Sequence, residues 1–244
     1  MKFFLRSLFL ISLFSTAAFA KTMTFNISKN GFPPYTIKNS GEAVSGIFVE
    51  VIQQIAQSYG HDIEVISLPR KRVTSMMLNE QVDLTVAAIE WIKNADDFIF
   101  TDGILDSRDV LFSLRKDPLL FSKLEDLYGN SLSTHLGYYY PFLNAAFVSQ
   151  KILRRDALSF ESMFKLALSN RTDAVVMNRD VGLWMIKNNP EFQGQFISSD
   201  KAINTFKLRL MFNKKWQPFV NKFNEKLALM RESGELRKII LSYR

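Results

Sequence analysis

Residues 77–86 read Met-Leu-Asn-Glu-Gln-Val-Asp-Leu-Thr-Val, and residues 168–176 read Leu-Ser-Asn-Arg-Thr-Asp-Ala-Val-Val. Each stretch joins the end of a helical pattern to a polar turn, an aspartate and an apolar run typical of a buried strand. The two aspartates, Asp83 and Asp173, lie about 90 residues apart, a spacing at which one structural unit can repeat. The repetition predicts two similar α/β lobes rather than one continuous domain.

Strand and helix patterns alternate around the first copy. Residues 48–58 carry apolar side chains at helical spacing, and Gly60 supplies a left-handed cap just after them. The expected strands are residues 23–28, 62–68 and 84–89, and the expected helices are residues 48–58 and 72–78. This βαβαβ order predicts a parallel sheet covered by helices.

The same order recurs around the second copy. Residues 132–136 are an expected strand, and residues 137–141 form a turn that leads into a helix. Ser159 is placed to cap a further helix over residues 160–169, before the strand expected at residues 174–177. The second lobe therefore has the same sequence of elements as the first.

The first twenty residues have the order of a secretory signal. Lys2 and Arg6 are basic, residues 8–14 are apolar, and Ala18-Phe19-Ala20 places small residues at a cleavage point. We expect cleavage after Ala20 and a periplasmic location, with an uncleaved anchor as the alternative. The apolar run is too short for a typical membrane-spanning helix.

The composition argues against several classes of function. The chain contains no Cys and two His, which argues against a structural zinc site, and we expect no cofactor. Its net charge of +7 is spread among acidic residues without a long basic stripe, so nucleic-acid binding has little support. The sequence also lacks a Gly-x-Ser-x-Gly elbow, a His-Glu-x-x-His motif and a phosphate-binding loop. We therefore expect a binding protein rather than an enzyme.

Five segments together resemble one protein family. They are Phe32-Pro33-Pro34-Tyr35 with residues 46–51, Pro69-Arg70-Lys71-Arg72, the strand-opening Asp83 and Asp173, Phe100-Thr101-Asp102, and residues 222–244. Their order resembles that of the periplasmic solute-binding proteins of ATP-driven uptake systems, in the amino-acid-binding group called family 3. The resemblance covers the whole chain after residue 20.

The resemblance implies the type II periplasmic-binding-protein fold. Such proteins have two lobes, each a small sheet flanked by helices, and two crossover strands form the hinge. Ligands sit where strands end at their carboxyl edge, which here is the cleft between the lobes. Lobe 1 would comprise residues 21–112 and 206–244, and lobe 2 would comprise residues 113–205.

The two charged anchors that the family uses for amino acids are missing at the matching positions. Asn94 stands where the family has the Arg that grips the ligand carboxylate, and Asn178 stands where it has the Asp that binds the amino group. Each replacement removes a charge-assisted hydrogen bond. We therefore expect the ligand to be a small polar organic solute other than a standard α-amino acid.

Other candidate ligand-binding residues lie on the expected cleft loops. Arg72 is the expected anion contact at a helix N-terminus, although it could instead pair with a nearby acid. Tyr35 and Trp91 are expected walls, with core packing and strand capping as their alternative roles. His135 and Tyr138 are the expected contacts from lobe 2, with a surface position as the alternative for His135.

These features predict a monomeric solute-binding protein that delivers a small-molecule ligand to an inner-membrane permease. Two alternatives remain open at this stage. One is a binding protein that signals to a membrane sensor, and the other is a lyase or dehydratase on the same fold that uses Glu90 and His135.

Overall fold

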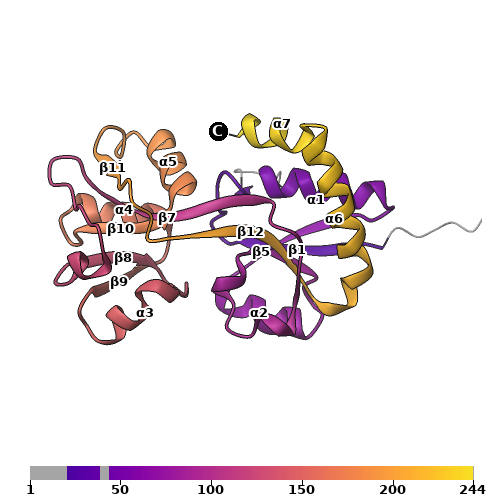
Figure 1. Cartoon of the computed structure of the whole chain (residues 1–244), viewed down its shortest axis with the longest axis horizontal. Helices are drawn as coiled ribbons and strands as arrows, with labels where there is room; N and C mark the ends of the chain where they lie inside the picture. Colours follow the sequence, from indigo (N-terminus) through magenta and orange to yellow (C-terminus); the bar gives the residue numbers. More distant parts are fainter. Residues whose placement is uncertain (1–20, 39–43, 244) are drawn as a thin grey trace, which may run out of the picture.

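Two long antiparallel strands organise the molecule. They are β7 (Leu105–Leu114) and β12 (Asn204–Phe212), and they run from one lobe into the other in the computed structural model, which describes residues 21–38 and 44–243 (Figure 1). β12 pairs with β7 through Asn204–Leu208 and with β5 (Leu84–Ala87) through Arg209–Phe212. The expected boundaries between residues 112 and 113, and between 205 and 206, both fall within these two strands.

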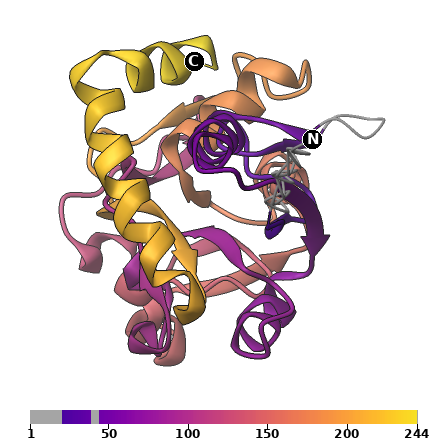
Figure 2. The ribbon, with the colours of Figure 1, turned by 90° about the vertical axis from the view of Figure 1, so that its right-hand side faces the viewer.

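Lobe 1 has strands in the order β4-β1-β5-β12, with β4 and β5 parallel to β1. Besides β5 and the lobe 1 part of β12, the elements of this lobe are β1 (Met23–Ser28), β2 (Ile37–Lys38), β3 (Val44–Ser45), α1 (Ile47–Ser58), β4 (Ile63–Leu68), α2 (Arg70–Leu78), β6 (Ile99–Phe100), α6 (Gln217–Glu232) and α7 (Glu235–Ser242). Figure 2 shows α6 crossing the outer side of this lobe and leading into α7. The chain thus returns to lobe 1 after completing lobe 2.

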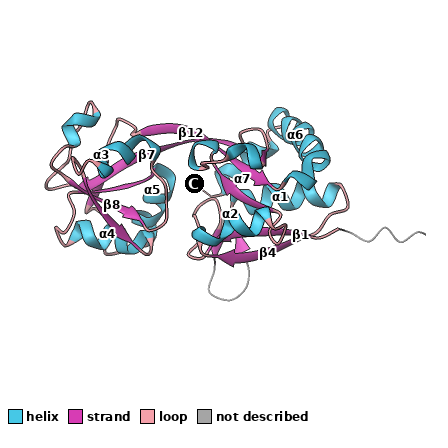
Figure 3. Cartoon of the chain, turned by 90° about the horizontal axis from the view of Figure 1, so that it is seen from below, coloured by secondary structure: helices cyan, strands magenta, loops and turns pink. Residues whose placement is uncertain are grey.

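Lobe 2 continues the pairing in the order β7-β10-β8-β9. Its elements are β8 (Ser131–His135), α3 (Pro141–Val148), β9 (Leu153–Ala157), α4 (Phe160–Leu168), β10 (Ala174–Asn178), α5 (Arg179–Asn188) and β11 (Phe196–Ser198). Figure 3 shows the two lobes side by side, joined by β7 and β12. The expected two-lobed α/β fold with two crossover strands is confirmed.

The repeated aspartate has the same structural role in both lobes. The Oδ2 atom of Asp83 accepts a hydrogen bond from the Thr24 N–H at 2.8 Å, and that of Asp173 accepts one from the Ser131 N–H at 2.6 Å. Each carboxylate therefore joins the start of its own strand to the start of the neighbouring parallel strand. This shared bond explains why the same residue precedes both apolar runs.

The expected elements match closely, with one shift that matters for the site. The helix expected at residues 72–78 begins at Arg70, because Pro69 is its extended N-cap and its fixed φ of −61° allows a helix to start immediately after it. The residues of the expected signal, 1–20, lie outside the described part of the chain. Within the described part, no helix is both long and apolar enough to cross a membrane.

Candidate functional site

A cavity of about 250 Å³ lies between the two lobes. Lobe 1 contributes Ser28 at the end of β1 and Thr85 in β5, and lobe 2 contributes Phe160 and Met177. The parallel strands β1 and β5 both point their carboxyl ends toward this space, which is where open α/β sheets bind ligands. The fold thus predicts a ligand site at the place where the cavity is found.

The lobes touch each other around the cavity, so the structure is a closed form. The Phe32 and Phe160 rings, one from each lobe, lie 6.1 Å apart between centroids. The Asn30 Nδ2 atom donates to the Leu158 carbonyl at 3.1 Å, also across the lobes.

Arg70 projects into the cavity from the first position of α2. Burial lowers the pKa of its guanidinium, and the neighbouring group that acts on it is Tyr138 from lobe 2. Within the described residues the guanidinium has neither a hydrogen-bond acceptor nor a carboxylate partner. Even with a lowered pKa an arginine stays protonated, so Arg70 is a positive charge with nothing to neutralise it.

Asp109 supplies a carboxyl group to the same cavity from β7. Burial raises the pKa of its carboxyl to about 7. The residues opposite it on the two flanking strands, Asn178 and Asn204, are neutral. Among the described residues, no hydrogen-bond donor and no cation pairs with the Asp109 carboxyl group.

Aromatic rings cover much of the cavity wall. Trp91 packs edge-on to Phe32 at 6.2 Å, and Tyr138 lies 4.2 Å from the His135 ring. The Nδ1 atom of His135 lies 3.0 Å from the Leu136 carbonyl oxygen, and burial lowers its pKa, so the imidazole is neutral at pH 7. The His135 ring packs against the Tyr138 ring and does not line the cavity.

Three of the expected ligand-binding residues line the cavity: Trp91, Tyr138 and Asn178. The Asn178 amide is already engaged. Its Oδ1 atom caps α5 by accepting from the N–H groups of Asp180 and Val181, and its Nδ2 atom donates to the Ser107 hydroxyl at 2.5 Å. Asn178 therefore shapes the cavity wall while its polar atoms hold the hinge.

The other four expected residues do not line the cavity. Arg72 and Asn94 are exposed, Tyr35 is fully buried beside the hinge, and His135 lies behind Tyr138. Arg72 misses the cavity because the helix starts at Arg70, and two residues correspond to a rotation of about 200° around a helix. The expectation that Arg72 is the anion contact from lobe 1 therefore disagrees with its placement.

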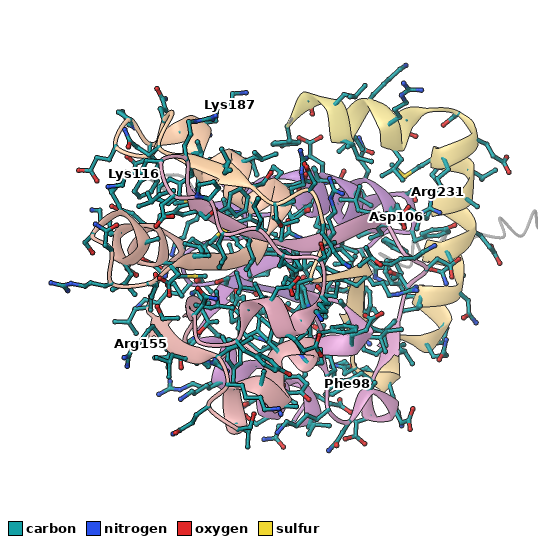
Figure 4. The ribbon with its side chains drawn as sticks, turned by 60° about the vertical axis from the view of Figure 1, so that its left-hand side comes forward. Phe98, Asp106, Lys116, Arg155, Lys187 and Arg231 are labelled. Carbon is teal, nitrogen blue, oxygen red and sulfur yellow. The ribbon has the colours of Figure 1, made fainter. Side chains whose placement is uncertain are left out.

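Glu90 and His135, named for a possible lyase, are not brought together at the cavity. Glu90 is exposed and borders a separate open groove beside the hinge, and His135 lies outside the lining of either space. Many other charged side chains face solvent. Figure 4 shows Lys116, Arg155 and Lys187 projecting outward from lobe 2. Their surface positions agree with the scattered charge in the sequence.

Sequence reasoning missed the charged residues that line the cavity, which are Arg70, Lys71 and Asp109. One signal for Arg70 was its position directly after Pro69 at the end of an expected strand, where a helix N-terminus faces the cleft. For Asp109, the signal was a lone carboxylate that directly precedes the apolar residues 110–112. An unpaired charge beside such a run requires a specific partner when it is buried.

Comparisons with known proteins agree with this architecture. The family model of bacterial extracellular solute-binding proteins, family 3, matches residues 26–244. No curated protein matches the chain. The solved structures described next are under 25% identical to this chain. Their similarity therefore shows its fold and nothing more.

Three solved structures illustrate the similarity. An ancestral arginine-binding protein bound to arginine is 19% identical, with a TM-score of 0.78 over 92% of this chain and 99% of that one. An arginine 3rd transport system periplasmic binding protein from Legionella pneumophila is 18% identical, with a TM-score of 0.76 over 92% and 100%. The GluR0 ligand-binding core from Nostoc punctiforme, in complex with L-glutamate, is 19% identical, with a TM-score of 0.73 over 91% and 98%.

The family model spans almost all of the described chain, and the two-lobed fold and the cavity between the lobes fit it. The protein belongs to the bacterial extracellular solute-binding proteins, family 3.

Proposed function

We propose that the protein captures a small polar organic solute between its lobes and delivers it to an inner-membrane permease. In this proposal residues 1–20 are an export signal cleaved after Ala20, and the mature protein works as a periplasmic monomer. The observation that carries the proposal is the cavity itself. It is bounded by both lobes, and the half-buried Arg70 and Asp109 line it without a hydrogen-bond or ion-pair partner among the described side chains.

Burial of unpaired charges is costly in a protein interior. A solute that supplies the missing counter-charges would remove that cost only when both lobes surround it. Binding would thus be coupled to closure, because Arg70 belongs to lobe 1 and Asp109 to the part of β7 that pairs with lobe 2. A permease that recognises the closed form would then distinguish the loaded protein from the empty one.

Standard α-amino acids are poor candidates for this solute. The position expected to grip their carboxylate holds Asn94, which is exposed and outside the cavity lining. The position expected to bind their amino group holds Asn178, whose amide already caps α5 and contacts Ser107. Both observations support a ligand that is held by other groups.

A thermal-shift screen of the mature protein tests the proposal. The panel would contain amino acids, amines, organic acids and short oligomers, and small-angle scattering would follow each hit to detect closure. A ligand at a hundred times its dissociation constant stabilises the folded protein by about 2.7 kcal/mol. If no compound shifts the melting temperature and none changes the scattering curve, the proposed solute capture is wrong.

Transport and sensing can be separated by a second experiment. The loaded protein would be added to membrane vesicles that contain the permease encoded beside it, and uptake of radiolabelled solute would be measured. Uptake that depends on the binding protein supports delivery. Binding without uptake would contradict it.

A further inference from the structure

We propose that the neutral imidazole of His135 positions the Tyr138 wall of the cavity, and that protonation of this ring at mildly acidic pH weakens solute binding. The inference rests on the proposed function and adds a means of regulating the same cavity. His135 packs against the cavity lining without belonging to it, so it acts through its two aromatic neighbours as a positioning residue.

The His135 ring lies directly behind one part of the cavity wall. Its centroid is 4.2 Å from that of Tyr138, with 33° between the ring planes, and 5.2 Å from that of Phe160. Tyr138 and Phe160 both line the cavity, whereas His135 is only 8% exposed. Because a buried ring cannot be removed without leaving a void, the two wall residues depend on the imidazole for their positions.

Tyr138 contributes to the contact between the lobes as well as to the wall. It follows β8 in lobe 2, and its phenol group interacts with Ser28 at the carboxyl end of β1 and with Arg70 at the start of α2. Ser28 and Arg70 belong to lobe 1. A displacement of the Tyr138 ring would therefore change both the shape of the cavity and a contact that crosses the cleft.

Hydrogen bonds tie His135 to the loop that carries Tyr138. The His135 N–H donates to the Tyr140 hydroxyl at 2.9 Å, and the Arg154 Nη2 atom donates to the Tyr138 carbonyl oxygen at 3.1 Å. The His135 Nδ1 atom lies 3.0 Å from the Leu136 carbonyl oxygen. Since a carbonyl oxygen only accepts hydrogen bonds, Nδ1 carries the proton of the neutral ring.

The other ring nitrogen makes this arrangement sensitive to pH. Nε2 of His135 is buried and has no hydrogen-bond partner among the described residues. In the neutral ring it holds only a lone pair, but protonation would add a positive charge and an N–H donor that lacks an acceptor. Burial of such a group is costly, and the cost falls if the ring turns toward solvent. The Tyr138 ring would then lose its support.

On β9, the charged groups beside His135 are Asp156 and Arg154. Asp156 favours the imidazolium, but its Oδ1 atom already accepts from the Arg154 Nη2 atom and from the Thr134 hydroxyl, each at 2.8 Å. Burial outweighs the attraction of Asp156 and lowers the pKa of His135 from its ordinary value of 6.5. The neighbouring carboxylate therefore does not compensate for burial of the cation.

The other elements around the ring offer no compensation either. On α4, Glu161 and Lys165 are exposed and pair with each other at 2.6 Å, and β10 has no titratable side chain. The pKa values of Tyr138 and Tyr140 are raised, so both phenols stay neutral in mildly acidic solution. From lobe 1, the charged group that acts on Tyr138 is the cation Arg70.

Proton NMR of the imidazole rings tests the inference on the mature protein. The chain has two histidines, and His61 packs against Trp216 and Phe219 in lobe 1, outside the cavity lining, so it is an internal control. The pKa of each ring would be measured without solute and with the solute that gives the largest thermal shift. A solute that binds tenfold more tightly to the neutral form lowers the pKa by about one unit. We expect that shift or more for His135, and none for His61.

Two variants separate ring packing from protonation. His135→Phe keeps an aromatic ring behind Tyr138 that takes up no proton, and His135→Ala removes the ring. Calorimetry at pH 7.5 and pH 5 would use the Asp109→Asn background, because the Asp109 carboxyl titrates near pH 7 and lines the cavity. In that background the parent and the control His61→Phe should bind about threefold or more weakly at pH 5. His135→Phe should lose this difference, and His135→Ala should bind about tenfold more weakly than His135→Phe at both pH values.

The outcomes separate this inference from the proposed function. If a solute binds and the pKa of His135 is the same in the empty and loaded proteins, the inference fails while solute capture stands. The same holds if His135→Phe keeps the pH dependence of its parent, or if His135→Ala binds as tightly as His135→Phe. If no solute of any class shifts the melting temperature, both the inference and the proposed function fail.

Discussion

Two arginines on one helix make a matched experiment at the scale of the residue. Arg70 lines the cavity without a partner, whereas Arg72 is exposed. Arg70→Ala should weaken binding of the solute identified in the thermal-shift screen by about 1.5–3 kcal/mol, the range for a hydrogen bond to a charged group. Arg72→Ala should leave affinity within twofold. Calorimetry measures the affinity of both variants for the solute, and their melting temperatures check that they fold. If the two variants lose the same amount of affinity, Arg70 is not a ligand-binding residue.

Asp109 predicts an unusual dependence of stability on pH. Burial raises the pKa of its carboxyl to about 7 in the folded protein, whereas the ordinary value in an unfolded chain is about 3.9. Between those values the folded state holds a proton that the unfolded state has released. The contribution of Asp109 to stability therefore decreases as the pH rises from about 4 to about 7, and it stays constant above that.

Asp109→Asn should accordingly stabilise the empty protein more at pH 8 than at pH 5. From pH 5 to the raised pKa of about 7 the difference amounts to at most about 2.7 kcal/mol, because each pH unit corresponds to about 1.36 kcal/mol. The group that interacts with Asp109 is Tyr140, whose pKa is raised by burial, and the residues opposite Asp109 on the flanking strands, Asn178 and Asn204, are neutral. None of these titrates between pH 5 and 8. Urea unfolding of both proteins at the two pH values measures the difference, and equal effects would show that Asp109 is not buried as an unpaired acid.

At the scale of the element, the aspartate that precedes the apolar strand in each lobe joins that strand to its neighbour. In lobe 1, Asp83 also accepts from the Trp216 Nε1 atom at 2.7 Å and pairs with the Lys215 Nζ atom at 2.9 Å. Burial by itself would raise the pKa of Asp83, but the hydrogen bonds from Trp216, Lys215 and the Thr24 N–H outweigh it and lower the pKa. In lobe 2, Asp173 is exposed and accepts from both the N–H and the hydroxyl of Ser131.

We expect Asp83→Asn to cost about 1.5–3 kcal/mol of stability at pH 7, the range for hydrogen bonds to a charged group. Asp173→Asn should cost less, about 1 kcal/mol, because water competes for an exposed acceptor and the amide oxygen can still accept. Because the folded-state pKa of Asp83 is lowered, its contribution is present above about pH 4 and is lost as the pH falls through the lowered value. Denaturant titrations at pH 7 and at acidic pH measure both variants, and an equal cost for the two would contradict the difference in burial.

For the whole molecule, Tyr35 joins the two lobes without lining the cavity. The single proton of its hydroxyl has two acceptors in reach, the Asn178 Oδ1 atom at 3.0 Å and an Asp180 carboxylate oxygen at 3.1 Å, and the hydroxyl lies 3.3 Å from the Ser107 hydroxyl on β7. These bonds exist only when lobe 1 reaches the start of α5 in lobe 2. The Tyr35 hydroxyl thus stabilises the closed form without touching the solute.

Tyr35→Phe should therefore shift the empty and loaded proteins toward the open form. Loss of a hydrogen bond worth about 0.5–1.5 kcal/mol, or more where the acceptor is charged, would weaken solute binding about threefold to tenfold. Small-angle scattering should report a larger radius of gyration at a solute concentration that closes the wild type. Phe32→Leu, which alters a cavity wall but retains the Tyr35 bonds, is the contrasting variant. An unchanged affinity for Tyr35→Phe would show that these bonds do not govern closure.

The order of the elements was predictable from the sequence because it depends on local patterns. Residues 48–58 place apolar side chains on one helical face, and helix α1 spans Ile47–Ser58. Gly60 was expected to end a helix in the left-handed region, and it has a φ value of 72°. The repeat of Asp83 and Asp173 then indicated two lobes. Each of these features is decided by residues a few positions apart.

The contents of the cavity depended on contacts between distant parts of the chain. A shift of two residues in the start of α2 placed Arg70 inside and Arg72 outside, because successive helical positions face different directions. Asp109 became half-buried because β7 lies between β10 and β12, so that Asn178 and Asn204 flank it. Sequence pattern alone therefore determined the lobes and their order. The tertiary structure decided which charged side chains line the cavity, because burial and pairing arise between segments that only the folded chain brings together.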